Sequence, residues 1–415
     1  MIKGSNLSQT IFALSEALDL VGIDDINHGK RVAYIALEIA KMLNYKNIDL
    51  ITLFHASLLH DCGVSSSKIH TKLVLEFDWL NAKDHCINGY NLLKQLDLFK
   101  ELALLVLFHH THWEDLKKMD YSNNIIEMSN IIFLADRIDV SIGKYCLENK
   151  ETHKLLSKEF IQNKIRTYSN DFFKKELVDA FLEVSDKESF WFNLEDHVIK
   201  NNLVSFMEEQ HCDKEPNLDI LHFKQTARLF SYFVDAKSNF TSEHSVGVAT
   251  LSKFISQEMG FNEKLIDKIE IAALLHDLGK LKISDQILEK KSSLTIEEFD
   301  LIKYHPFETN RILSNIAGIE DITLWASQHH EKLNGNGYPY HYSDKEIPMQ
   351  SRIIAVSDIF QALAQNRPYR EQLTSDKILE ILKIKVNLND IDKDIVRFIE
   401  LNLENCWKSS LSYEL

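Results

Sequence analysis

The spacing of hydrophobic residues predicts α-helix along almost the whole chain. In residues 160–184 (FIQNKIRTYSNDFFKKELVDAFLEV) and 218–238 (LDILHFKQTARLFSYFVDAKS), apolar positions recur at intervals of three and four, the period of one helix face. Helix-breaking residues are scarce, with 12 glycines and 5 prolines, and four of the prolines fall between positions 306 and 368. The pattern therefore predicts an all-α fold.

The chain also repeats itself. Its 415 residues exceed what one hydrophobic core usually organises. LLHDCG at 58–63 reappears as LLHDLG at 274–279, so that His60 and His276 lie 216 positions apart. The simplest account is an internal duplication that gives two tandem helical domains, 1–210 and 225–415. A linker and connecting helix at 211–224, around Pro216, would join them.

Histidine and aspartate dominate the repeated positions. Further pairs follow in the same order with offsets between 216 and 222: His28 and His244, His85 and His305, His109 and His329, His110 and His330, Asp136 and Asp358. A single histidine in an apolar helix is usually a core residue, but a whole set that recurs twice is costly to bury without a purpose. The set therefore favours metal binding.

Mixed imidazole and carboxylate ligands without cysteine favour iron or manganese. Adjacent helical residues point about 100° apart, so His276 and Asp277 suit a site with two ions, bridged by the Asp277 carboxylate. Two such ions can generate a bridging hydroxide and clamp a phosphodiester during in-line displacement. Lys280 follows His276 by one helical turn, which predicts an ammonium aimed at a phosphate oxygen.

The net charge, the cysteines and the lack of long apolar runs argue against several other classes of protein. The formal net charge of −15 argues against a partner that is a nucleic-acid polymer, because such proteins cluster lysine and arginine. Five widely spaced cysteines without a CxxC pair indicate reduced thiols. Neither a signal peptide nor an apolar run of about 18 residues is found, so we expect a cytoplasmic protein that does not enter the membrane.

Residues 225–412 resemble the HD-GYP family of the HD phosphohydrolase superfamily. The motifs that carry the resemblance are HDLGK (276–280), HP (305–306), HHEKLNGNGYP (329–339), SD (357–358) and RPYR (367–370). The resemblance implies a bacterial second-messenger enzyme, a metal-dependent phosphodiesterase that hydrolyses cyclic di-GMP to pGpG and GMP at a site of two or three iron or manganese ions.

The resemblance also implies roles for individual residues. The metal ligands would be His244, His276, Asp277, His305, His329, His330 and Asp358. Asp277 and Lys280 would be catalytic. The substrate contacts would be Lys280, Arg367, Arg370, Asn334, Gly335, Gly337 and Tyr338. The loop that ends in GYP would also offer a surface for a diguanylate cyclase or another signalling protein.

Three departures from the family pattern change the expectation. Asn334 and Gln361 stand where the family usually has aspartate, and both keep hydrogen bonding while losing charge. Phe240 stands four residues before His244, where trinuclear members have a glutamate ligand. The sequence therefore predicts two metal ions.

The N-terminal repeat resembles the superfamily more loosely. Its potential metal ligands are His28, His60, Asp61, His85, His109, His110 and Asp136, and Asp24 lies one turn before His28. Val64 replaces the lysine, and no glycine loop follows His110. We expect a degenerate HD-like domain that is catalytically silent and regulatory.

Two alternative functions stay open at this point. The substrate could be a different nucleotide, such as mixed cyclic GMP-AMP or a nucleoside phosphate, because Asn334 and Gln361 differ from the common motif. The protein could also be a non-catalytic cyclic dinucleotide receptor, although the complete ligand set with Lys280 weighs against that. A homodimer is an assembly that the sequence neither requires nor excludes.

Overall fold

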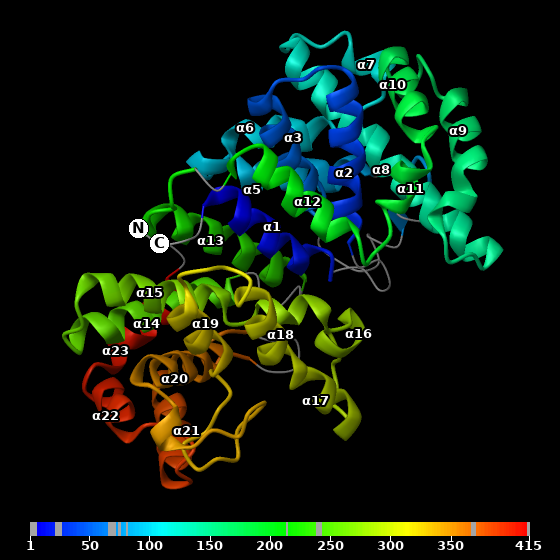
Figure 1. Cartoon of the computed structure of the whole chain (residues 1–415). Coiled ribbons are helices and arrows are strands. Elements are labelled where there is room, and N and C mark those ends of the chain that lie inside the picture. The colour runs from blue at the N-terminus through cyan, green and yellow to red at the C-terminus, as the bar shows by residue number, and fades with distance from the viewer. Residues whose placement is uncertain are drawn as a thin grey trace. The chain divides into compact units, whose positions relative to one another are not determined.

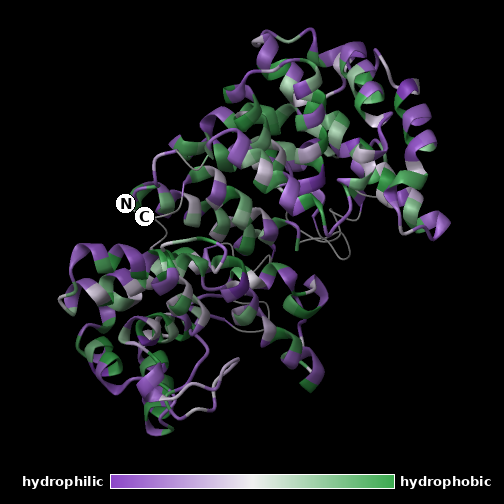
Figure 2. Cartoon of the chain, in the orientation of Figure 1, coloured by the Kyte–Doolittle hydropathy of each residue, from purple (hydrophilic) through white to green (hydrophobic). Residues whose placement is uncertain are grey.

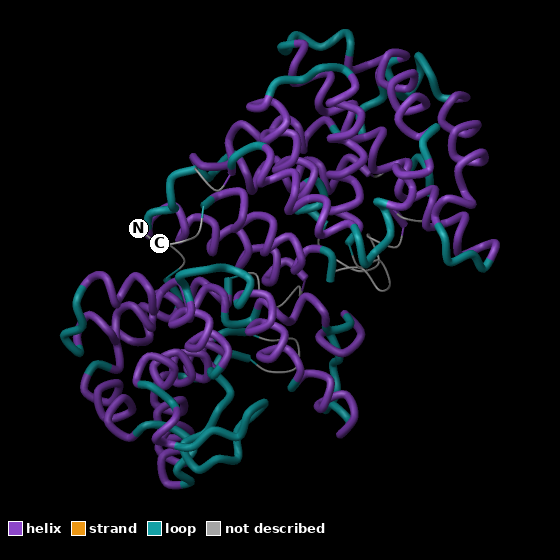
Figure 3. Tube along the Cα trace, in the orientation of Figure 1, coloured by secondary structure: helices purple, strands orange, loops and turns teal. Residues whose placement is uncertain are grey.

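The computed structural model describes residues 6–20, 27–64, 72–73, 76–79, 82–212, 215–237, 243–366 and 371–412. Throughout these residues the chain consists of helices and loops without a β-strand, which confirms the all-α prediction (Figure 3). The chain divides into two compact units, one spanning Asn6–Pro216 and the other beginning at Asn217 (Figure 1). This division falls within the expected linker.

The N-terminal unit is a bundle around α2 and α8. Its helices are α1 (Leu7–Leu18), α2 (His28–Met42), α3 (Asn47–Leu59), α5 (Ala82–Leu93), η1 (Asp97–Phe99), α6 (Lys100–Phe108), α7 (Trp113–Leu116), α8 (Asn123–Asn149), η2 (Lys154–Ser157), α9 (Lys158–Thr167), α10 (Lys175–Ser185), α11 (Glu188–Phe192) and α12 (Ile199–Glu209). Helix α2 packs against α3 and α8, and α6 packs against α5 and α8. Val32, Leu53 and Ile131 are fully buried between them.

The C-terminal unit repeats this arrangement. Its helices are α13 (Ile220–Lys237), α14 (His244–Glu258), α15 (Glu263–Leu275), η4 (Leu278–Lys282), α16 (Asp285–Leu288), α17 (Ile296–Ile302), α18 (Tyr304–Leu313), α19 (Glu320–Ser327), η5 (Asp344–Glu346), α20 (Met349–Ala364), α21 (Ser375–Asn387), α22 (Lys393–Leu401) and α23 (Leu403–Ser410). Helix α14 packs against α15 and α20, and α19 packs against α18 and α20. Helices α14, α15, α18, α19 and α20 therefore correspond to α2, α3, α5, α6 and α8.

One glycine in each repeat fixes a close approach between two of these helices. A Cβ atom on Gly63 would lie 1.9 Å from the carbonyl oxygen of His85, and one on Gly279 would lie 2.1 Å from that of His305. No side chain fits at such distances. The glycine of LLHDCG and LLHDLG thus brings the turn after the HD pair against the helix that carries the next histidine.

Burial follows the hydrophobic pattern within each unit. Apolar and polar residues alternate along the helical ribbons (Figure 2), as expected for helices with one face in a core. Among the described residues, no helix combines the length and the apolarity needed to cross a bilayer.

Candidate metal centre

Helix ends position the histidines of the C-terminal unit. Helix α15 ends at Leu275, and the Nδ1–H of the next residue, His276, donates to the carbonyl of Ala273 at 2.7 Å. His305 bonds Ile302 in the same way at 2.7 Å, and His329 bonds Ala326 at 2.8 Å. The last carbonyls of a helix lack partners within the helix, so each bond satisfies one of them and turns the Nε2 atom inward.

Asp277 lies at the centre of these Nε2 atoms. Its Oδ1 atom is 3.3 Å from His305 Nε2 and 3.8 Å from His329 Nε2. Its Oδ2 atom is 3.2 Å from His276 Nε2 and 3.6 Å from His244 Nε2. Each carboxylate oxygen therefore faces a different pair of imidazoles.

Two further elements complete the cluster. His244 is the first residue of α14, and its Nε2 atom lies 3.2 Å from Oδ1 of Asp358 in the middle of α20. The ring of His330 lies 4.1 Å from that of His329 and 5.0 Å from that of His305. All seven expected ligands are therefore brought together from α14, α18, α20 and the turns that follow α15 and α19.

The polar atoms of the cluster fit a cation. His276 Nε2 and Asp277 Oδ1 are buried without a hydrogen-bond partner, which is costly unless a positive charge faces them. Burial alone would raise the pKa of Asp277, but His276 and Lys280 hold it well below its usual range. Burial, with the nearby His305, lowers the pKa of His330 to about 3. Ionised carboxylates and neutral imidazoles are the forms that bind metal ions.

Lys280 differs from its expected placement. Helix α15 stops before His276, and the chain continues as the 3₁₀ turn η4, so His276 and Lys280 do not share a helix face. The Lys280 Nζ atom instead lies 2.5 Å from Asp277 Oδ2, and a quarter of its side chain is exposed. The ammonium thus stands at the solvent edge of the Asp277 carboxylate.

The GYP loop packs on the cluster through Tyr338. The Tyr338 ring lies 4.8 Å from that of His330, and its backbone N–H donates to the His330 carbonyl at 3.2 Å. Glu331 fastens the loop by accepting the backbone N–H groups of Tyr340 and Tyr342 at 2.7 and 3.1 Å. A Cβ on Gly337 would lie 2.4 Å from Lys332 N, so only glycine fits there.

Asn334 is engaged within the loop itself. Its Nδ2 atom donates to Leu388 O at 2.9 Å and to Asp390 Oδ1 at 3.0 Å, and its Oδ1 atom accepts the N–H of Asn336. Gly335 adopts a φ of 78°, the left-handed region that favours glycine. These contacts support a structural role for Asn334, and its role in binding substrate stays a prediction. Arg367, Arg370, Phe240 and Asp24 lie outside the described residues.

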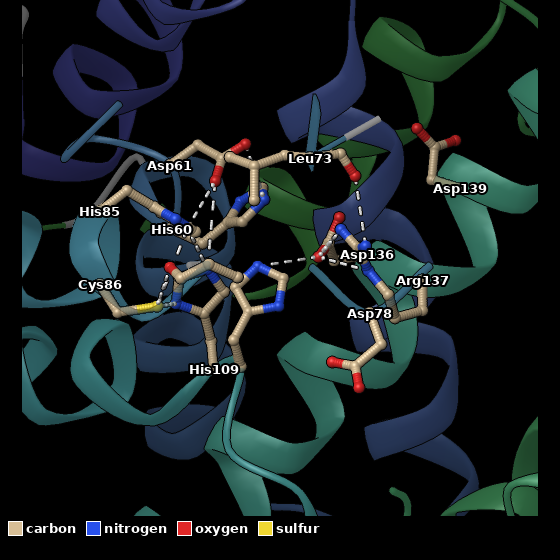
Figure 4. A network of polar contacts seen from close by, with 12 residues as sticks. His60, Asp61, Leu73, Asp78, His85, Cys86, His109, Asp136, Arg137 and Asp139 are labelled. Atoms are coloured by element: carbon tan, nitrogen blue, oxygen red, sulfur yellow. Dashed lines mark hydrogen bonds and ion pairs between the residues drawn. The ribbon is translucent and has the colours of Figure 1, made fainter. Parts of the chain in front are cut away.

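The N-terminal unit builds the same cluster from the equivalent helices (Figure 4). Asp61 Oδ1 lies 3.3 Å from His85 Nε2 and 4.0 Å from His109 Nε2, while its Oδ2 atom faces His60 at 3.5 Å and His28 at 3.7 Å. Asp136 lies 3.6 Å from His28 and 3.5 Å from His110. His60 and His109 also donate from Nδ1 to a carbonyl three residues earlier.

The surroundings of the two clusters differ. Val64 is buried at the position of Lys280, and Arg137, at the position of Ile359, donates to Asp136 Oδ2 from Nε at 3.0 Å and from Nη2 at 2.7 Å (Figure 4). The other Arg137 nitrogen bonds the carbonyls of Leu73, Glu76 and Phe77. Arg137 was not among the predicted site residues, although the charge beside Asp136, where the other repeat has Ile359, sets it apart in the sequence.

Comparisons with known proteins agree with this geometry. Two HD domain families match the chain, one over residues 225–395 and one over residues 25–141. The fold and the paired His-Asp clusters define a metal-dependent phosphohydrolase built from two HD domains.

Individual similar proteins identify the family more closely. The 3′3′-cGAMP-specific phosphodiesterase 1 of Vibrio cholerae is 32% identical over 98% of this chain and 94% of its own length. A cyclic di-GMP phosphodiesterase of Thermotoga maritima is 32% identical over 57% of this chain and 56% of its own. A crystal structure of a cyclic GMP-AMP specific phosphodiesterase of V. cholerae shares the fold, with a TM-score of 0.61 at 23% identity over 98% of both chains. The chain belongs to the HD-GYP family.

Proposed function

We propose that this chain is a phosphodiesterase that opens cyclic dinucleotides at the metal centre of its C-terminal unit. The observation that carries the proposal is the position of Asp277, whose two oxygens face separate imidazole pairs while Lys280 stands at its outer edge. Relatives named for cyclic di-GMP and for 3′3′-cGAMP support the substrate class. These two nucleotides are the candidates to compare.

The donor set supports two ions of iron or manganese. It contains nitrogen and oxygen atoms and no sulfur, which suits those metals. His305 and His329 would hold one ion, His244 and Asp358 the other, with Asp277 between them. Such ions act as Lewis acids that activate water and neutralise phosphate charge.

The chain's own residues would orient the substrate. The Lys280 ammonium can bond a non-bridging phosphate oxygen, where charge grows in the transition state. Tyr338 covers the His330 side of the site. Arg367 and Arg370 stay predictions as contacts for phosphate or guanine, since an arginine fork suits both groups.

The N-terminal unit would hold a metal without performing hydrolysis. Its ligand cluster matches that of the C-terminal unit, yet Val64 removes the ammonium and Arg137 occupies one Asp136 oxygen. A centre without a phosphate cradle offers little stabilisation of a transition state. A regulatory role is the proposal that follows.

The test compares isosteric variants of the two central aspartates. The full chain, loaded with iron or manganese without oxygen, is assayed on cyclic di-GMP and 3′3′-cGAMP with product analysis. Asp277→Asn should abolish turnover and Asp61→Asn should retain it. Loss of turnover in Asp61→Asn alone would place the reaction in the other unit, and wild-type protein that binds both nucleotides without cleaving them would favour a receptor.

A further inference from the structure

His244 is oriented by an amide in the interior of the C-terminal unit. Its Nδ1 atom lies 2.5 Å from Gln361 Oε1, and both side chains are buried. An amide oxygen only accepts, so Nδ1 carries the hydrogen and donates it. The Nε2 lone pair is thereby left facing Asp277 and Asp358, at 3.6 and 3.2 Å.

Gly247 makes room for this amide. A Cβ atom on Gly247 would lie 2.9 Å from both Cγ and Nε2 of Gln361, and 2.6 Å from the carbonyl oxygen of Ser410. Any larger residue would displace Gln361 or the end of α23. The Gln361 Nε2 atom is buried without a hydrogen-bond partner. The contact that engages this amide is therefore the one between its oxygen and His244.

In the N-terminal repeat, charged residues orient the equivalent histidine, His28. Asp139, at the position of Gln361, accepts from His28 Nδ1 at 2.8 Å. Its other oxygen accepts from Nε of Arg31 at 2.7 Å, and Arg31 stands at the position of Gly247. The N-terminal repeat thus has a carboxylate and a guanidinium where the C-terminal repeat has an amide and a glycine. The net charge of the two residues is zero in both repeats.

This difference alters how strongly the histidine donates to a metal. A carboxylate that accepts from Nδ1–H makes the imidazole a stronger electron donor, whereas a neutral amide fixes the ring with less donation. Either acceptor fixes the hydrogen on Nδ1 and leaves Nε2 turned toward the cluster.

We propose that Gln361 is a positioning residue that fixes the hydrogen on His244 Nδ1 and so turns the Nε2 atom toward the metal, as Asp139 does for His28 in the other repeat. This role rests on the proposed metal-dependent function, but it concerns metal binding before any substrate is present. Gly247 serves the role by leaving space for the amide.

The test measures metal affinity in the full chain. All variants carry Asp61→Asn, which removes the central ligand of the N-terminal cluster, so that a chelator competition with manganese reports on the C-terminal centre. Gln361→Met keeps the volume and removes the acceptor, and it should weaken metal binding by roughly 10- to 100-fold. Gln361→Glu restores an acceptor and should bind the metal at least as tightly as Gln361.

Two outcomes would overturn the proposal. One is unchanged manganese affinity in Gln361→Met, and the other is a loss of affinity in Gln361→Glu equal to that in Gln361→Met. Unfolding temperatures of the metal-free variants show that each is folded, and no outcome of the chelator competition depends on which phosphodiester the enzyme cleaves.

Discussion

The Nε2 atoms of His305 and His329 lie 3.1 Å apart, the same separation as between His85 and His109 in the other unit. Both lone pairs point into the cluster because each Nδ1–H of His305 and His329 is bonded to a helix-end carbonyl. Two imidazoles held this way either share a proton or bind one cation. The cation is the better partner, since neighbouring Asp277 is ionised.

Metal removal should therefore destabilise the protein. A ligand at about 100 times its dissociation constant stabilises the folded state by about 2.7 kcal/mol. Differential scanning calorimetry of chelated and manganese-loaded protein should give a higher unfolding temperature for the loaded form. The double variant Asp61→Asn with Asp277→Asn serves as control and should show no such difference. Equal temperatures for both forms of the wild type would contradict metal binding.

Lys280→Met should slow turnover and leave the metal in place. The side chain keeps its length but loses the charge that faces Asp277 and the phosphate, and losing one such donor typically costs about 10²- to 10³-fold in kcat. Metal content is measured alongside the rate. Lys282→Met is the matched control, because Lys282 is more exposed and pairs with Glu308 at 3.6 Å. A drop in metal content for Lys280→Met would show that Lys280 supports the ligands instead.

Gly337→Ala should disturb substrate binding. The new Cβ would lie 2.4 Å from Lys332 N and 2.5 Å from Glu331 Cα, so the loop that seats Tyr338 on His330 must shift. Such overpacking costs about 1–3 kcal/mol. Gly260→Ala is the control, since its φ of 81° is strained by about 1–2 kcal/mol while nothing lies within 4 Å of the new Cβ. Both should unfold at lower temperature, and only Gly337→Ala should raise KM.

His55 should make the N-terminal unit sensitive to acid. Ser8 donates its hydroxyl hydrogen to Glu215, so His55 Nε2–H donates to Ser8 Oγ at 2.8 Å, and burial lowers the pKa of His55 to about 4. Between pH 6.5 and about 4, the unfolded chain binds a proton at His55 that the folded chain does not bind. The free energy of unfolding therefore decreases as the pH is lowered through that window. The loss is about 3 kcal/mol.

The His55→Gln variant checks this sign. Glutamine can donate to Ser8 but does not titrate, so urea unfolding of the variant should lose less stability than the wild type between pH 6.5 and 4. Above pH 7 the two should respond to pH alike. A steeper pH dependence in the variant would mean that His55 is charged in the folded protein.

The sequence predicted the helical fold and the two groups of neighbouring histidines and aspartates because both depend on patterns within single segments and on the repeat. It did not predict where the helices end. The placement of Lys280 rested on a helix continuing past His276, whereas α15 stops at Leu275 and the turn brings Lys280 to Asp277.

Partners distant in sequence were also missed. Gln361 was noted only as a lost charge, and its bond to His244, 117 residues away, follows from how α20 packs against α14. Arg137 and Asp139 depend on tertiary packing in the same way. Aligning the two repeats position by position would have exposed Asp139 opposite Gln361 and Arg31 opposite Gly247.

The bonds from histidine Nδ1 to the carbonyl three residues earlier have an evolutionary consequence. They tie His60 and His109 in one repeat, and His276 and His329 in the other, to backbone that any helix end provides. The substrate-handling positions lie instead in turns and loops, where Val64 could replace a lysine without disturbing a ligand. After duplication, therefore, a copy can lose its chemistry while its metal-binding signature persists, and a genome survey that counts HD pairs alone will overestimate the number of catalytic centres.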